Sequence, residues 1–135
     1  MIKNLKINSL SLLRIFLGFV FTSAGVYRLM NWNDFLLEFS RFPFGKFNKY
    51  LIIFVIALEI IGGLLLISNK NSKTVISIFI AFVALALLQI IATNAPILIK
   101  QSYELFSFDA TPTDVFLHFT YLVILIYLIL EPSKN

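Results

Sequence analysis

Four long apolar runs, separated by polar connections, set the pattern of this sequence. They cover residues 9–30, 50–68, 74–99 and 112–130. Each run is about as long as the ~20 residues that an α-helix needs to cross the hydrocarbon core of a bilayer. The pattern therefore predicts a single transmembrane domain, residues 1–135, built from four spanning helices.

The connection between the first two runs, about 32–48, mixes aromatic side chains with charged ones. Such an amphipathic stretch is typical of a helix that lies in the interface between membrane and water. We therefore expect a short interfacial helix here, with Phe35, Phe39 and Phe42 on its buried face.

Composition agrees with a membrane protein, because hydrophobic residues make up 59% of the chain and charged residues 13%. Soluble domains average about 45–50% and about 25%. A chain of 135 residues has no room for a soluble catalytic domain beside the helices. The predicted fold is all-α, an integral membrane four-helix bundle with a short interfacial helix between helices one and two.

Charge and cysteine content exclude several classes of function. The formal net charge of +4 indicates attraction to the headgroups of the lipid bilayer, and we see no nucleic-acid signal. The chain has no Cys and one His, which excludes thiol chemistry, iron–sulfur ligation, a two-histidine haem and a zinc cluster, so no metal site is expected. Any electron chemistry needs a bound cofactor or another subunit.

The basic residues bear on the orientation of the chain in the membrane. With both termini in the cytoplasm, six lie on the inner side, namely Lys3, Lys6, Arg14, Lys70, Lys73 and Lys134. Five lie on the outer side, namely Arg28, Arg41, Lys46, Lys49 and Lys100. Cytoplasmic loops carry an excess of Lys and Arg, so the count favours a multi-pass protein of the cell membrane with cytoplasmic termini.

Glu59 is the most informative single residue, because it stands in the middle of the second apolar run. A carboxylate at the bilayer centre costs at least ~2.5 kcal/mol, and such residues usually face a bundle interior and mark functional sites. The structural alternative is a protonated Glu that hydrogen-bonds a neighbouring helix and serves packing. Both interpretations stay open at this point.

Counting residues along the helices places other polar groups near the depth of Glu59. At ~1.5 Å per residue, Glu59 lies ~13 Å below Tyr50, whereas Arg28 sits just under the same surface. About 10 Å of depth then separates Arg28 from Glu59, so we expect water or a ligand between them instead of direct contact.

Gln89 and His118 fall in the same half of the membrane by this count, with Thr93 and Tyr121 on the same helix faces. We therefore predict a polar half-cavity that binds a ligand, lined by Arg28, Glu59, Gln89, Thr93, His118 and Tyr121. Each residue also has a structural interpretation: Arg28 can snorkel to the headgroups, and the others can satisfy hydrogen bonds between helices.

Two short motifs resemble the DoxX family of small membrane proteins, whose broader kin include DoxD-like and MauE-like proteins. One is the end of the first helix, Ala24-Gly25-Val26-Tyr27-Arg28, and the other is Glu59-Ile60-Ile61-Gly62-Gly63 in the second. The resemblance covers roughly the first two thirds of the chain. Relatives often have Lys where this chain has Arg28, which keeps the charge and changes the donor geometry.

The resemblance implies a four-helix bundle with its termini inside and an association with membrane redox systems. Those systems include a quinone-linked thiosulfate oxidoreductase and partners of secreted redox enzymes. No family active site can be transferred to this chain, and whether it is an enzyme stays open.

Three functions are compatible with the sequence. We favour a redox-associated membrane subunit, which works with a redox partner subunit and binds a quinone or another lipid-soluble ligand in the polar half-cavity. The runner-up is a non-catalytic assembly or anchoring protein that recruits a partner enzyme through aromatic residues such as Phe42 and Phe44. A solute carrier is least favoured, because the paired broken helices of carriers are lacking. A homo-oligomer stays open.

Overall fold

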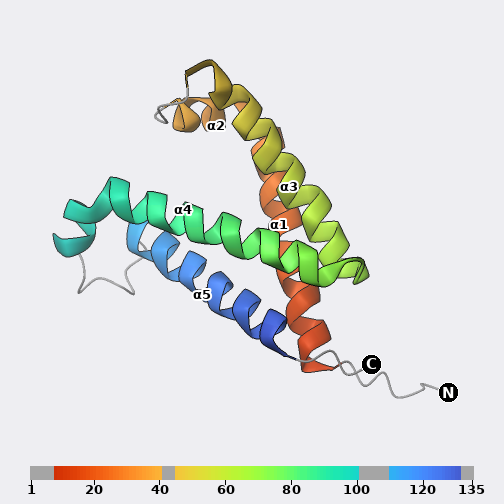
Figure 1. The fold of residues 1–135 in the computed structure, drawn as a ribbon. Helices are drawn as coiled ribbons and strands as arrows, with labels where there is room; N and C mark the ends of the chain where they lie inside the picture. Colours follow the sequence, from red (N-terminus) through yellow and green to blue (C-terminus); the bar gives the residue numbers. More distant parts are fainter. Residues whose placement is uncertain (1–7, 41–44, 101–109, 132–135) are drawn as a thin grey trace. The chain divides into compact units, whose positions relative to one another are not determined.

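A computed structural model of the chain describes residues 8–40, 45–100 and 110–131, and only the backbone at residues 38, 93–100 and 110–114. All the regular elements in the described ranges are helices (Figure 1). The predicted all-α class is therefore confirmed. The chain divides into two compact units, Met1–Ser72 and Lys73–Asn135.

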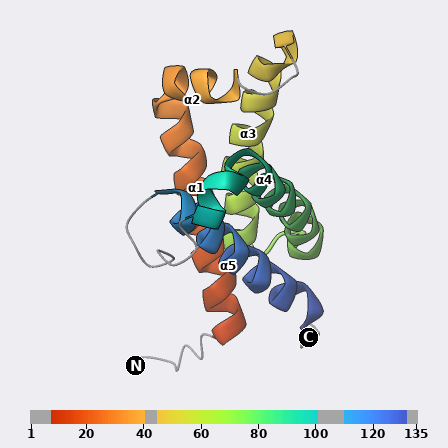
Figure 2. The ribbon, with the colours of Figure 1, turned by 90° about the vertical axis from the view of Figure 1, so that its left-hand side faces the viewer.

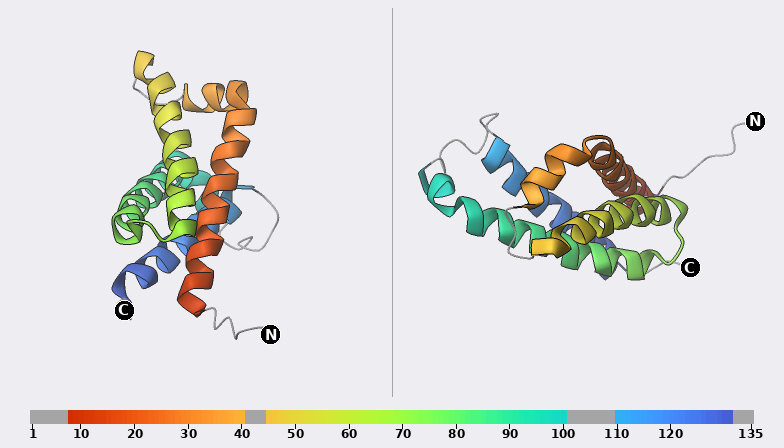
Figure 3. Two further views of the ribbon diagram at one scale, coloured as in Figure 1. Left: turned by 90° about the vertical axis from the view of Figure 1, so that its right-hand side faces the viewer. Right: turned by 90° about the horizontal axis from the view of Figure 1, so that it is seen from above.

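The first unit consists of helices α1 (Ser9–Met30), α2 (Trp32–Phe39) and α3 (Asn48–Ser68), with a short 3-10 helix, η1 (Gly45–Phe47), before α3. Helices α1 and α3 run antiparallel and side by side, and α2 lies across the end of this pair (Figures 2 and 3). A short helix, α2, is thus present in the connection where one was expected, and its place in the membrane interface stays a prediction.

The α1–α3 interface is built from side chains that recur every three or four residues. On α1 the buried residues are Leu17, Gly18, Phe21 and Gly25, which share one face of the helix. On α3 they are Ile52, Val55, Ile56, Glu59, Gly62, Gly63 and Leu66. Small residues let helix backbones approach closely, which is how helices associate inside a membrane where lipid is as apolar as Leu.

The two helices are shifted along their axes relative to each other. Gly25 faces Glu59 and Ile60, while Gly18 faces Gly63 and Ile67. This register leaves the first six or so residues of α3, ~9 Å of helix, beyond the end of α1. Figure 2 shows the projection, and α2 packs against the part of α3 near it.

Helix α3 ends in a Schellman motif. Asn69 has left-handed backbone angles, with φ 59° and ψ 21°. The N–H of Asn69 donates to the carbonyl of Leu66 at 3.3 Å, and the N–H of Lys70 donates to the carbonyl of Leu65 at 3.2 Å. These bonds satisfy carbonyls that have no partner within the helix, and they stop α3 at a defined residue.

The second unit consists of α4 (Ser72–Lys100) and α5 (Ala110–Leu130). The buried hydrophobic residues of α4 are Val75, Ile76, Phe79 and Val83, which lie on one face, and Leu125 is buried on α5. Phe42 and the connection 101–109 lie outside the described residues, so predictions about them stay predictions.

Three helical segments among the described residues are long and apolar enough to span a membrane: Ser9–Met30, Gly45–Ser68 and Ser72–Ala92. A shorter apolar helical segment, Val115–Leu130, belongs to α5. The protein is therefore an integral membrane protein, and the fourth crossing stays a prediction.

Candidate functional site in the first unit

An ion pair joins the two long helices of the first unit. The guanidinium Nη1 of Arg28 on α1 donates to the carboxylate Oε1 of Glu59 on α3. The Glu59 side chain is only 3% exposed, whereas that of Arg28 is 25% exposed. The carboxylate is thus held inside the helix packing, and the arginine reaches it from a more open position.

This contact corrects the expectation that water or a ligand separates Arg28 from Glu59. The expectation assumed that Arg28 lies level with the first residues of α3. The structure instead places Gly25 opposite Glu59, so Arg28, three residues further on, is only ~4.5 Å away along the axis. An extended arginine side chain spans that offset.

Gly25 makes the close approach of α1 to Glu59 possible. A Cβ at this position would lie 3.0 Å from the Cβ of Glu59 and 2.7 Å from Cγ1 of Ile60. A larger residue would push the two helices apart at the level of the ion pair. Gly25 and Arg28 are three residues apart on α1 and so share one face of the helix, and the structure turns that face toward α3.

The buried carboxylate of Glu59 depends on the charge of Arg28. A buried carboxylate without a partner costs several kcal/mol of solvation, and breaking a buried ion pair from one side typically costs ~3–5 kcal/mol. Arg28 therefore supplies the opposite charge that the buried carboxylate of Glu59 needs. The pair can thus hold two opposite charges together within the helix packing.

A second hydrogen-bond donor of Arg28 is available at this place. Its Nε is buried and has no hydrogen-bond partner among the described residues. Guanidinium carries five N–H donors in a fixed fork, so one edge can hold Glu59 while another meets an acceptor such as a carbonyl oxygen. The pair thus leaves one buried N–H donor of Arg28 unused among the described residues.

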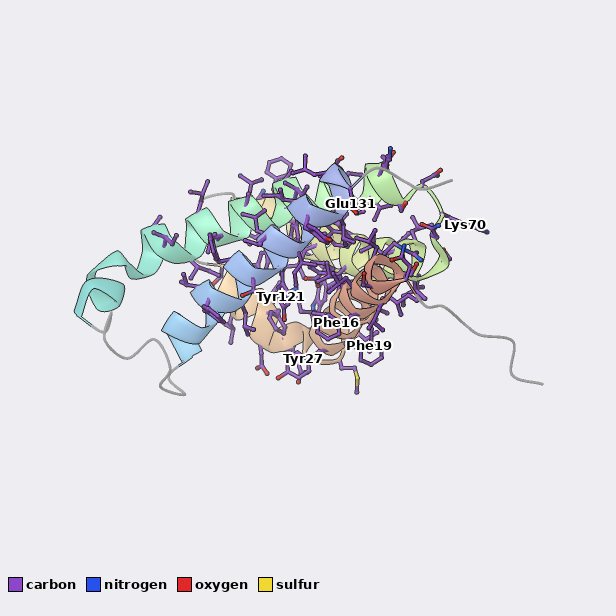
Figure 4. The ribbon with its side chains drawn as sticks, turned by 90° about the horizontal axis from the view of Figure 1, so that it is seen from below. Phe16, Phe19, Tyr27, Lys70, Tyr121 and Glu131 are labelled. Carbon is purple, nitrogen blue, oxygen red and sulfur yellow. The ribbon has the colours of Figure 1, made fainter. Side chains whose placement is uncertain are left out.

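The arginine also lies near an aromatic ring of α2. The Cζ of Arg28 lies 5.3 Å from the ring centroid of Phe35 on α2. The ring of Tyr27 meets that of Phe35 edge-on, with centroids 6.0 Å apart and an interplanar angle of 84°. Figure 4 shows Tyr27 and Phe19 projecting outward from α1. Phe35 thus contributes a cation–π contact to the site.

The remaining predicted site residues belong to the second unit. Gln89 is exposed on α4, and Thr93 lies in α4 with its side chain outside the described residues. His118 and Tyr121 lie on α5, with ring centroids 6.5 Å apart. The structure thus brings together Arg28 with Glu59, and His118 with Tyr121. That all six line one cavity stays a prediction.

Sequence reasoning missed the roles of two residues. Arg14, which the sequence places only among the basic residues of the inner side, donates from Nη1 to the backbone carbonyls of Leu66 and Ile67 on α3. Phe35 was expected on the buried face of the interfacial helix, but its contact with Arg28 was not. The signal for both was weak, because each contact joins residues that are far apart in sequence or on different helices.

A shallow pocket of about 240 Å³ lies at the corner between α1 and α2. It is lined by Met30, Asn31, Trp32, Asn33 and Asp34. Among the described residues, no group of three or more His, Asp or Glu side chains is placed to hold a metal ion.

Comparison with known families gives one result that covers most of the chain. The profile of the family described as "Methylamine utilisation protein MauE" matches residues 7–98. The match includes α1, α2, α3 and most of α4, and hence both partners of the ion pair. No match was found among curated proteins or among solved structures.

Proposed function

This chain belongs to the MauE family, and on that premise we propose that it is a membrane subunit serving a redox enzyme system. We further propose that it binds a quinone or a similar lipid-soluble ligand beside the Arg28–Glu59 pair. The family is described as one of methylamine utilisation, and methylamine is an oxidisable amine, which supports a role beside a redox enzyme. A relation to DoxX proteins remains part of this proposal.

One observation carries the ligand proposal: an arginine bound to a buried carboxylate still has a buried N–H donor without a partner among the described residues. A quinone carbonyl is a hydrogen-bond acceptor that dissolves in the bilayer core. The Nε–H of Arg28 would orient that oxygen, and Glu59 would hold or release a proton next to it.

Mass spectrometry of lipid-soluble molecules that co-purify in mild detergent tests the proposal. We expect a quinone to co-purify with the wild-type protein and to be lost in Arg28→Gln. Arg14→Gln is the matched control, because it removes the same charge from the same helix 14 residues away, ~21 Å along the axis. Absence of any quinone from the wild-type protein, or its retention in Arg28→Gln, contradicts the proposal.

The alternative is a non-catalytic assembly or anchoring protein for a partner enzyme. It is favoured by the tight packing at Gly18, Gly25 and Gly63, because an ion pair within such packing can serve to fix the register of two helices. This function predicts that Glu59→Gln supports the same membrane electron transfer as wild type. It also predicts that substitution of Phe42 or Phe44 abolishes co-purification of the partner.

We also propose that the protein lies in the cell membrane with cytoplasmic termini, as the distribution of basic residues favours. Reporter fusions at the C-terminus and in the connection 69–71 test the orientation. Both reporters should show a cytoplasmic location, and periplasmic activity at either site would reverse the assignment.

A further inference from the structure

The short helix α2 is held to the rest of the first unit on one side only. Its half-buried described side chains are Trp32, Phe35 and Phe39, which share a face, and none of its described residues is fully buried. A helix of eight residues is not stable by itself in water. Whether α2 stays docked therefore depends on the few contacts that this face makes.

The contact at Phe35 connects α2 to the ion pair. The guanidinium of Arg28 lies 5.3 Å from the Phe35 ring centroid, and the same guanidinium donates to Glu59. Arg28 thus touches a surface helix through one part of its guanidinium and a buried acid through another. Its position over the ring depends on where the carboxylate holds it.

Loss of the charge on Glu59 would free the Arg28 side chain to leave the Phe35 ring. An arginine without a buried partner is drawn toward the headgroups and water, because its long side chain can snorkel. Arg28 is already 25% exposed, so the path outward is open. Movement in that direction takes the guanidinium off the Phe35 ring and removes the cation–π contact.

We propose that the docking of α2 onto the first unit depends on whether Glu59 is charged. Arg28 links the two, and Phe35 is its contact on α2. A change of protonation inside the membrane is thereby converted into movement of a helix at its surface. This inference does not need a bound quinone, and it fails or holds independently of the proposed function.

The fluorescence of the single tryptophan of the chain can report whether α2 is docked. Trp32 is the first residue of α2, and it is half-buried beside a shallow pocket. The experiment measures acrylamide quenching and the emission maximum of Trp32 in the full-length protein, in phosphatidylcholine nanodiscs. Circular dichroism in parallel shows that the long helices remain folded.

We expect Glu59→Gln and Phe35→Leu each to raise the quenching of Trp32 and to shift its emission to longer wavelength. The docked-to-undocked ratio should fall roughly fivefold in each, the size expected of one partly exposed cation–π contact. Phe35→Tyr keeps the aromatic face and should behave as wild type. Arg14→Gln, which removes a charge far from α2, should also leave Trp32 unchanged.

The double variant decides whether the two residues act along one path. If Arg28 links them, Glu59→Gln has no further effect on Trp32 once Phe35 is Leu. Additive effects would overturn the proposal, as would an unchanged Trp32 in a folded Glu59→Gln protein. If Glu59→Gln does not fold, Arg28→Gln provides the second test, because it removes the cation from the Phe35 ring. The quenching of Trp32 should rise as in Phe35→Leu, and a wild-type signal would count against the link.

Discussion

Arg14 donates a hydrogen bond to the backbone carbonyl of Leu66, so an arginine of α1 holds the C-terminal end of α3. The carbonyls there are those that the helix leaves without internal partners, and the helix dipole places partial negative charge on them. Arg14 and Arg28 therefore bind α3 at two levels, one at its end and one near its middle.

Replacing Arg14 by Gln should loosen the end of α3. The charge-assisted bonds to Leu66 and Ile67 are lost, and we expect stability to fall by about 1–2 kcal/mol. Hydrogen exchange of the amides from 65 to 70 should become faster while exchange near Glu59 stays the same. Lys70→Gln, at an exposed position of the same turn, is the control and should have little effect.

Gly63→Ala should separate α1 from α3. A Cβ at this position would lie 2.6 Å from the carbonyl oxygen of Gly18 and would also strike Thr22. We expect a loss of about 1–3 kcal/mol in unfolding free energy, as for overpacking in other cores. Titration with a denaturing detergent measures this loss. Leu64→Ala, at a position that is 53% exposed, should be close to wild type, and equal effects of the two substitutions would argue against close packing at Gly63.

The two ends of the ion pair should respond unequally to substitution. Arg28→Met leaves a carboxylate that is 3% exposed without its partner, and it should cost about 3–5 kcal/mol. Glu59→Leu should cost less, because Arg28 can reach the headgroups. The double variant should be more stable than Arg28→Met alone, since no buried charge remains. A double-mutant cycle of unfolding free energies checks this order.

Replacing Asn69 by glycine should leave the stability of the protein unchanged, whereas replacing it by alanine should lower the stability. Its φ of 59° lies in the left-handed region, which costs an alanine roughly 1–2 kcal/mol and a glycine very little. Asn69→Gly should therefore keep the thermal stability of wild type, and Asn69→Ala should lower it. A wild-type stability of Asn69→Ala would mean that the Schellman motif does not end α3 in the membrane.

The long apolar helices could be predicted from the sequence because apolar length is a property of each segment alone. The buried position of Glu59 followed from its place in the second run, and the short helix α2 from its aromatic pattern. Gly25 and Arg28 share a face of α1 because they are three residues apart, a relationship that spacing along one helix fixes. The match to the MauE family agrees with the broader kin of the DoxX resemblance.

The direct contact between Arg28 and Glu59 could not be predicted, because spacing within each helix does not determine the shift of one helix against another. Counting depth from Tyr50 placed Arg28 level with the start of α3, whereas the glycines at 18, 25 and 63 set a different register. The link from Arg28 to Phe35 required the direction of α2, which the break at Asn31 determines. Both features depend on tertiary packing.

Both arginines of α1 find their partners on α3, which has a consequence for biosynthesis. α1 leaves the ribosome first, and at that stage Arg14 and Arg28 have neither the carbonyls of Leu66 and Ile67 nor the carboxylate of Glu59. Until α3 is made, each of these side chains can reach the headgroups at its own end of α1. The partners on α3 then replace the headgroups, so the register of the two helices is fixed only after α3 has entered the bilayer.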